Sequence, residues 1–223
     1  LTTKPPLVLL LHHNDTDGLS AGAIISRSLE RAMIPITRYC LEKPYPIVLE
    51  QLFADPHLPQ ETVVLFVDFG SGMLSRIAAA NRRRFSVLVL DHHQLEDFSD
   101  PAIEVLNCNQ HGISGSTGCS ASAVAYCFAL GLGEWNAKLA HLGVLGALGD
   151  SFLTGGELSD LNSELVSLAR TQGSVSVNGE YRFQLSQDVG AMQLIACLDA
   201  LGSVGYYKGG PDIAIKGLLD NQI

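Results

Sequence analysis

Several features of secreted, membrane-spanning and zinc-finger proteins are missing from this sequence of 223 residues. Its cysteines number five, an odd count, and none forms a CxxC pair, which argues against a disulfide framework or a zinc knuckle. No apolar run approaches the ~20 residues of a membrane span. The apolar run at 7–11 has no cleavage site after it, which argues against a signal peptide. We therefore expect a cytoplasmic protein with no membrane contact.

Basic residues are also scarce, because 14 Lys and Arg stand against 23 Asp and Glu, for a net charge of -9. That balance argues against a broad nucleic-acid surface, although a local basic groove stays open. The arginine run at 82–84 is predicted to be a solvated helix end, since cations favour helix C-termini, and not a grip on a nucleic-acid backbone. Bound divalent cations would offset part of the negative charge.

The hydrophobic pattern predicts an α/β fold, with a mainly parallel sheet flanked by helices in three layers and a helical C-terminal half. Strands are predicted at 7–11, 36–40, 62–69 and 85–93, and helices at 20–33, 46–53 and 72–83. Strands and helices thus alternate through the first 110 residues, which is typical of βαβ units. After about residue 115, helices are predicted at 117–133, 136–150 and 156–173, followed by a hairpin at 175–183 and a last helical pair around 202–211. We expect residues 1–223 to form one domain.

Carboxylates and imidazoles follow three of the predicted strands. They are found in HHNDTDG at 12–18, at Asp68 in VDFG, and in the DHH triplet at 91–93, and Asp150 closes an apolar helix. Because sites in parallel sheets lie outside the carboxyl ends of the strands, we expect these groups to meet at one edge. Carboxylates so close together could not all stay ionised without cations. Capping and turn duty, the ordinary role of Asp, does not predict such a coincidence.

The donor set points to the kind of metal. Carboxylate oxygens with some imidazole nitrogen and no thiolate suit Mn²⁺ or Mg²⁺ better than structural zinc. Five carboxylates and several histidines exceed the needs of one ion. Two ions sharing a bridging carboxylate would use them, and such pairs recur in enzymes that hydrolyse phosphoesters.

These motifs resemble those of the DHH phosphoesterases. The triplet at 91–93 matches the motif that names the family, HNDTDGLSAG resembles its first motif, HxDxDGxxS, and VDFG its second. The segment GALGDSFLTGGELSDLNSELV is similar to the fourth motif. The segments GCSASAVAYCFA and LDALGSVGYYKGGPDIAIKGLLDN are most similar to RecJ-like nucleases, with Ser203 where an arginine is usual.

The resemblance implies a metal-dependent phosphodiesterase or exonuclease that acts on single-stranded DNA or short oligonucleotides through two Mn²⁺ or Mg²⁺ ions. It implies one ion on His13, Asp15 and Asp68, and a second on Asp17, Asp68, His92 and Asp150. Asp91 would bind a metal or orient the adjacent imidazoles, and His93 would contact the scissile phosphate, because successive residues of an extended stretch point oppositely.

Other functions stay open on the sequence alone. The substrate could be pyrophosphate, a cyclic dinucleotide or a nano-oligonucleotide, or the chain could be a catalytically silent module that binds nucleic acid. The loop GISGSTG at 112–118 could cradle a phosphate or be a plain flexible loop. The second lobe usual in the family, DHHA1, is not recognisable here, so we expect it, or a partner in its place, in the full-length protein.

Overall fold

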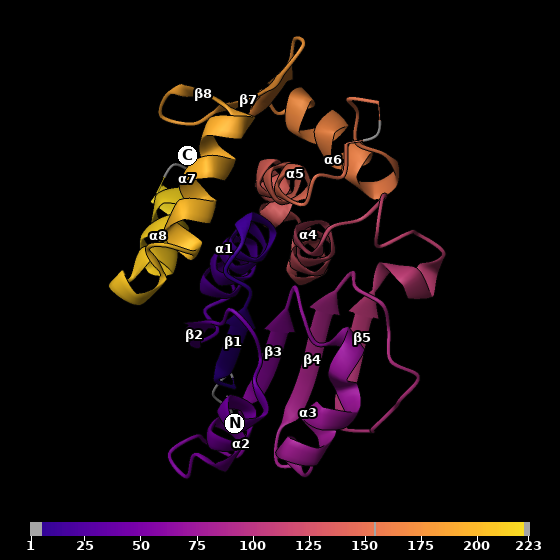
Figure 1. The fold of residues 1–223 in the computed structure, drawn as a ribbon, viewed down its shortest axis with the longest axis vertical. Helices are drawn as coiled ribbons and strands as arrows, with labels where there is room; N and C mark the ends of the chain where they lie inside the picture. The colour runs from indigo at the N-terminus through magenta and orange to yellow at the C-terminus, as the bar shows by residue number, and fades with distance from the viewer. Residues whose placement is uncertain (1–5, 154, 221–223) are drawn as a thin grey trace.

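The computed structural model describes residues 6–153 and 155–220, and their fold is drawn in Figure 1. A five-stranded sheet occupies the N-terminal half, and every neighbouring pair of its strands is parallel. The strands are β1 (Val8–His12), β2 (Ile36–Cys40), β3 (Val63–Val67), β4 (Ser86–Asp91) and β5 (Ile103–Asn107). The order in the sheet is β2-β1-β3-β4-β5. This confirms the predicted α/β class.

Alternating side chains of the strands build two apolar cores, one on each face of the sheet. Leu9 and Leu11 of β1 face α2 (Pro46–Ala54) and α3 (Leu74–Asn81). Val8 and Leu10 face the opposite core, which contains α1 (Thr16–Arg31), α4 (Ala121–Leu132) and α5 (Ala140–Gly149). Complete burial of a Leu or Phe side chain stabilises a fold by about 1.5–3 kcal/mol. The continuous apolar runs therefore mark strands that are covered on both faces.

The register of the sheet aligns the residues that follow three strands. His12 pairs with Val67, and Val67 pairs with Leu90, so β1, β3 and β4 reach the carboxyl edge at the same level. The chain crosses from β1 to β2 on one side and then to β3 on the other, which makes the β1–β3 boundary the topological switch point. Ligand sites of open α/β sheets lie in the crevice at such a point.

The C-terminal half covers this edge with helices and a small sheet. It contains α6 (Asp160–Thr171), β6 (Val175–Val177), β7 (Tyr181–Gln184), β8 (Asp188–Gly190), α7 (Ala191–Gly202) and α8 (Gly210–Asp220). Figure 1 shows these elements beyond the arrowhead end of the strands. The hairpin predicted at 175–183 is confirmed, and β8 adds an antiparallel strand that the sequence did not predict. Among the described residues, no helix combines the length and apolarity needed to cross a bilayer.

The predicted alternation of strands and helices was wrong between β4 and β5. β5 was not predicted, and it joins β4 in parallel through a loop without a helix. Its side chains are mostly half-buried, so the sequence shows neither a continuous apolar run nor a clean alternation. The start of the first helix was also misplaced, because α1 begins at Thr16 and not at Ser20. Its first turn is polar since it borders the site, which hides it from hydrophobic periodicity.

Candidate metal centre

The turn after β1 carries the first group of polar side chains. Asp15 caps α1, and its Oδ1 accepts a hydrogen bond from the backbone N–H of Gly18 at 2.9 Å. The other oxygen of this carboxylate lies 2.8 Å from His13 Nδ1. Burial alone would lower the pKa of His13, but the carboxylates of Asp15 and Asp68 outweigh it and raise that pKa to about 10. The metal-free site therefore keeps a proton where a cation would fit.

Asp68 lies between the two halves of the site. It follows β3 in the left-handed backbone region, with φ of +67°, and it is almost fully buried. Its Oδ2 lies 3.6 Å from His13 Nδ1, and its Oδ1 lies 3.4 Å from His92 Nε2. Burial raises the pKa of this carboxyl, and the two imidazoles oppose that rise. Asp68 is thus the carboxylate that contacts both imidazoles.

A second group is formed by Asp17, His92 and Asp150, whose ligand atoms lie within 4.8 Å of one another. His92 Nε2 lies 3.4 Å from Asp150 Oδ2, yet this buried nitrogen has no hydrogen-bond partner among the described residues. Burial raises the pKa of Asp17 to about 7 and that of Asp150 to about 8, and the neighbouring carboxylates add to both shifts. An orphaned ring nitrogen among crowded carboxylates is the arrangement that a divalent cation would satisfy.

The N-terminus of α4 holds Asp17 in place. The backbone N–H groups of Ala121 and Ser122 donate to its two carboxylate oxygens at 2.7 and 2.9 Å. These amides are among the unpaired donors at a helix start, and the helix dipole there favours an anion. On the other side, a Cβ at Gly146 of α5 would come within 2.3 Å of Asp17 Oδ1. Close approach of α5 to this carboxylate therefore requires glycine.

Asp91 orients both histidines of the DHH triplet. Its Oδ1 accepts from the backbone N–H groups of His92 and His93 at 2.8 and 3.2 Å, and it lies 2.7 Å from the His93 Nδ1. Its Oδ2 accepts from the backbone N–H of Ser71 at 2.9 Å. These contacts suit the orienting role that the sequence left open for Asp91, and its carboxylate also lies in a group with Asp68, His92 and His93 whose ligand atoms are within 4.8 Å of one another. The side chain of His93 is 57% exposed, whereas the other two residues of the triplet, Asp91 and His92, are buried.

Several residues that support the site were not predicted from the sequence. His92 Nδ1 lies 2.6 Å from the carbonyl oxygen of Gly115, so Nδ1 must donate and Nε2 is directed to the carboxylates. The side chain of Asn109 ties the two segments together, because it donates to the carbonyl of His92 and accepts from the N–H of Gly115. The loop at 112–118 thus positions His92. Asn109 follows β5, whose absence from the predicted strands concealed its role.

Helix α7 also grips the turn that carries the first group. Asp199 Oδ1 accepts from the hydroxyl of Thr16 at 2.7 Å and from its N–H at 3.2 Å. The Nδ2 of Asn14 donates to the carbonyl of Gly202 at 2.8 Å. A Cβ at Gly202 would come within 1.7 Å of the backbone carbonyl oxygen of Asn14. α7 therefore clamps the residues on either side of Asp15.

Removal of this clamp is expected to loosen the site without removing a ligand. Asp199→Ala should weaken Mn²⁺ binding by about tenfold or more, in the range seen when outer partners of metal ligands are lost. Asp199→Asn keeps an acceptor oxygen for Thr16 and should remain within about threefold of the unaltered protein. Isothermal titration calorimetry measures both, and equal affinities for the alanine and asparagine variants would contradict the clamp.

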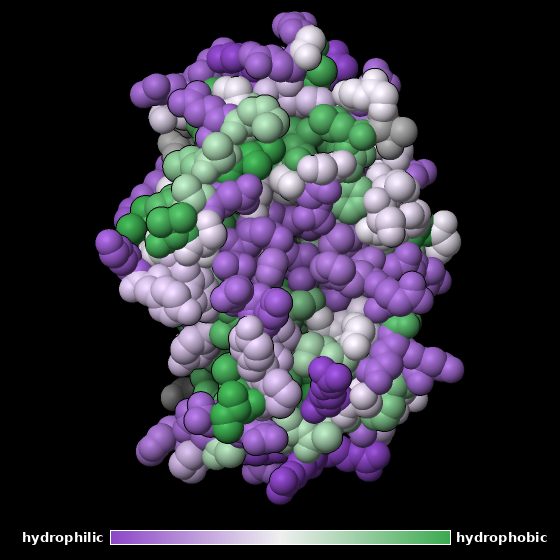
Figure 2. Space-filling view, viewed as in Figure 1, coloured by the Kyte–Doolittle hydropathy of each residue, from purple (hydrophilic) through white to green (hydrophobic). Residues whose placement is uncertain are grey.

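Hydrophilic side chains surround the site on the surface. Figure 2 shows them gathered across the middle of one face, at the level where the arrowheads of β3, β4 and β5 end in Figure 1. The structure thus brings all eight predicted site residues to one edge of the sheet, the first group after β1, Asp68 after β3, the triplet at the end of β4, and Asp150 after α5.

Known proteins resemble this chain in sequence or in fold. The DHH family, N-terminal domain, matches residues 7–147. An uncharacterized protein of Methanocaldococcus jannaschii is 29% identical over 181 residues, which is 80% of this chain and 40% of the relative. A crystal structure of exonuclease RecJ bound to manganese has a TM-score of 0.69 at 16% identity, and covers 97% of this chain and 58% of that chain. RecJ from Thermus thermophilus in complex with Mn²⁺ has a TM-score of 0.65 at 17% identity, with 96% and 32% covered.

These comparisons differ in what they establish. At such identities the RecJ structures show likeness of fold, and the chain spans about 40% of the length of the curated relative that it matches. The family match covers more than half of the chain and includes every predicted site residue except Asp150, which lies three positions beyond it. On this match, the chain belongs to the DHH family.

Proposed function

We propose that the chain is a metal-dependent phosphodiesterase of the RecJ-like kind, which cleaves single-stranded or short oligonucleotides. The observation that carries the proposal is the position of Asp68, whose two oxygens face different imidazoles, His13 at 3.6 Å and His92 at 3.4 Å. A pair of divalent ions shares such a carboxylate between them. The crowded carboxylates and the orphaned His92 Nε2 fit these ions.

The proposed ligands divide into two sets that share Asp68. One Mn²⁺ or Mg²⁺ ion would be held by His13, Asp15 and Asp68. The other would be held by Asp17, Asp68, His92 and Asp150. Two such cations supply Lewis acidity, which activates water and offsets charge on a phosphate. In support, solved RecJ structures are described in complex with Mn²⁺ or with Mg²⁺.

His93 is the proposed contact to the substrate phosphate. The hydrogen bond to Asp91 raises the pKa of His93 despite partial burial, which favours the protonated imidazole. Since Nδ1 faces Asp91, the exposed Nε2–H is left to donate to a phosphate oxygen. A donor fixed in advance stabilises the charge that develops in the transition state at no cost of reorganisation.

Short substrates suit this chain better than long ones. Affinity for long strands rests on many contacts to phosphates, and the net charge of -9 leaves few cations to make them. We propose that residues 1–223 form the catalytic domain, and that a second lobe or a partner holds longer strands. In support, the chain covers 58% of the RecJ chain and 40% of its curated relative.

A substrate panel with Mn²⁺ supplied tests the proposal. We expect hydrolysis of a single-stranded oligonucleotide of about ten residues, with weak binding of a much longer strand and a shallow dependence of that binding on salt. RNA, a cyclic dinucleotide and pyrophosphate complete the panel. If pyrophosphate or the cyclic dinucleotide is hydrolysed faster than the oligonucleotide, that compound represents the preferred substrate class.

Two outcomes would contradict the proposal outright. If none of these compounds is hydrolysed although calorimetry confirms bound Mn²⁺, the chain is a catalytically silent binding module. Tight binding of the long strand that weakens steeply with salt would refute the preference for short substrates. A chelator control in each reaction shows that hydrolysis depends on the metal.

A further inference from the structure

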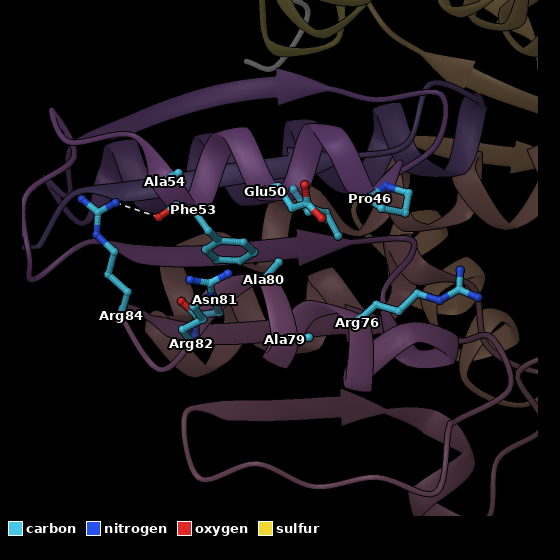
Figure 3. A pocket seen from close by; sticks show the side chains of 11 residues that line it. Pro46, Glu50, Phe53, Ala54, Arg76, Ala79, Ala80, Asn81, Arg82 and Arg84 are labelled. Carbon is cyan, nitrogen blue, oxygen red and sulfur yellow. Dashed lines mark hydrogen bonds between the residues drawn. The ribbon is translucent and has the colours of Figure 1, made fainter.

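A second cavity lies between helices α2 and α3, apart from the metal centre. We name it the α2–α3 groove, and its volume is about 730 Å³, within the range of small-molecule sites. None of the proposed metal ligands lines it. Figure 3 shows Pro46 and Arg76 at one end of the groove and Ala54, Arg82 and Arg84 at the other.

Small side chains keep the groove open. Ala79 and Ala80 line it from α3, and neither fills the space toward α2. Its open apolar surface comes from Pro46, Ala54, Ala79 and Ala80, because Leu49 and Phe53 of α2 line the groove but are almost fully buried. A ligand lying here would therefore meet an apolar surface along its middle, as the base or sugar of a nucleotide requires.

The groove is basic although the chain is acidic. Of the described residues, three arginines (Arg76, Arg82 and Arg84) and one carboxylate (Glu50) line it, in a chain with a net charge of -9. Arg84 has a structural role and is not part of the solvated helix end that the sequence predicted. Its guanidinium donates to the carbonyls of Phe53 and Asp55, both at 2.7 Å, and lies 4.4 Å from the ring centre of Phe85. Its charge is thus fixed at this end of the groove.

Arg82 lies beside this fixed charge and is free to bind. Within residues 6–153 and 155–220, its guanidinium has no hydrogen-bond or ion-pair partner, whereas Arg83 pairs with Asp100 at 3.3 Å. Both arginines adopt the left-handed backbone region, with φ of +50° and +57°, where glycine is favoured. Arg82 lines the groove and Arg83 does not. The turn thus places Arg82 on the groove and directs its neighbour Arg83 to Asp100.

We propose that the α2–α3 groove is a binding site for a nucleotide, with the phosphate on Arg82 beside Arg84 and the nucleoside on the apolar surface. Arginine suits both parts, because its planar guanidinium binds phosphate with two hydrogen bonds and stacks on aromatic rings. Arg76 of α3 lies at the other end of the groove from Arg82 (Figure 3). A free mononucleotide and the phosphorylated end of a strand carry the same chemistry. The site does not depend on the function proposed for the metal centre.

Binding of adenosine 5′-monophosphate in the presence of a chelator tests this site with the metal centre empty. By calorimetry we expect a Kd of about 0.1–1 mM, and at least about tenfold weaker binding of adenosine or of inorganic phosphate alone. Arg82→Gln should weaken binding by about tenfold or more, and the matched control Arg83→Gln should stay within about twofold. Ala79→Leu should also weaken binding, because it fills the exposed groove without a change of charge.

A 5′-phosphorylated trinucleotide separates the two sources of the ligand. Affinity equal to that of the mononucleotide would show that strand ends fit, and weaker affinity would show a site for free nucleotides. Absence of binding at about 10 mM mononucleotide would overturn the proposal. An equal loss in Arg82→Gln and Arg83→Gln would also overturn it, because general charge would then explain the binding. So would unchanged affinity in Ala79→Leu with an unchanged melting temperature.

Discussion

Asp68→Asn is expected to abolish metal-dependent hydrolysis, by about a thousandfold or more, or roughly 4 kcal/mol of transition-state stabilisation. The reason lies in its position, since Asp68 is the carboxylate that faces both His13 and His92. Loss of its charge weakens the proposed sites of both ions together. The asparagine tolerates the left-handed backbone at φ of +67°, so the turn should keep its shape.

The same substitution is expected to leave the metal-free fold as stable as before, or more stable. Asp68 lies among the carboxylates of Asp15, Asp17 and Asp150, so removal of one buried charge relieves their repulsion, and this offsets the lost attraction to the His13 and His92 imidazoles. Thermal unfolding in chelator measures this directly. Asp97→Asn is the matched control and should change neither activity nor stability, because Asp97 is exposed and its carboxylate makes no hydrogen bond or ion pair within the described residues.

His93→Ala should behave differently from Asp68→Asn. Its imidazole is exposed and is held by Asp91, so its loss should leave Mn²⁺ affinity within about threefold and reduce turnover by about a hundredfold. Calorimetry and kinetics on the two variants test this division. Loss of metal binding in His93→Ala would show that the DHH triplet is divided wrongly between ligand and phosphate contact. Residual hydrolysis near the unaltered rate in Asp68→Asn would rule out a shared carboxylate.

Stability of the metal-free protein is expected to fall as pH rises, and Mn²⁺ should reverse that fall. Burial opposes protonation of His13 and His92, but carboxylate neighbours raise the pKa of each from 6.5 to about 10. Burial raises the pKa of Asp17 from 3.8 to about 7 and that of Asp150 to about 8. All four groups thus hold protons in the native state that the unfolded chain has released.

The sign of the effect follows from this excess of protons. A native state that binds more protons than the unfolded state loses stability with rising pH, by about 1.4 kcal/mol per unit for each proton retained. The imidazoles contribute between pH 6.5 and about 10, and the carboxyls between 3.8 and about 7 or 8. Between pH 6 and 8, the melting temperature in chelator should fall by about 10 °C or more.

Divalent cations replace these protons, so the stabilisation by Mn²⁺ should grow with pH. At about 100 times its Kd, a ligand stabilises the native state by about 2.7 kcal/mol. Melting curves at pH 6, 7 and 8, with chelator or with about 1 mM Mn²⁺, measure the difference. An increment that shrinks with rising pH would contradict the proton displacement. No increment at any pH would refute the metal centre itself.

Some of the molecule could be predicted from local sequence. β1, β3 and β4 are continuous apolar runs, and such runs indicate strands covered on both faces. β5 could not be found in this way, because an edge strand with half-buried side chains lacks both apolar continuity and clean alternation. The first turn of α1 was lost for a related reason, since its polar residues serve the site and not the core.

The sequence by itself determined the chemistry of the candidate site, because the residue types that can bind a metal follow directly after apolar runs that indicate buried strands. Only the tertiary structure decided how they are arranged. The register of β1, β3 and β4 aligns the residues that follow them, and this places Asp68 between two imidazoles. The supports of the site come from far along the chain, such as Asp199, which is 183 residues from Thr16. Local patterns carry no information about such contacts, because packing of whole elements creates them.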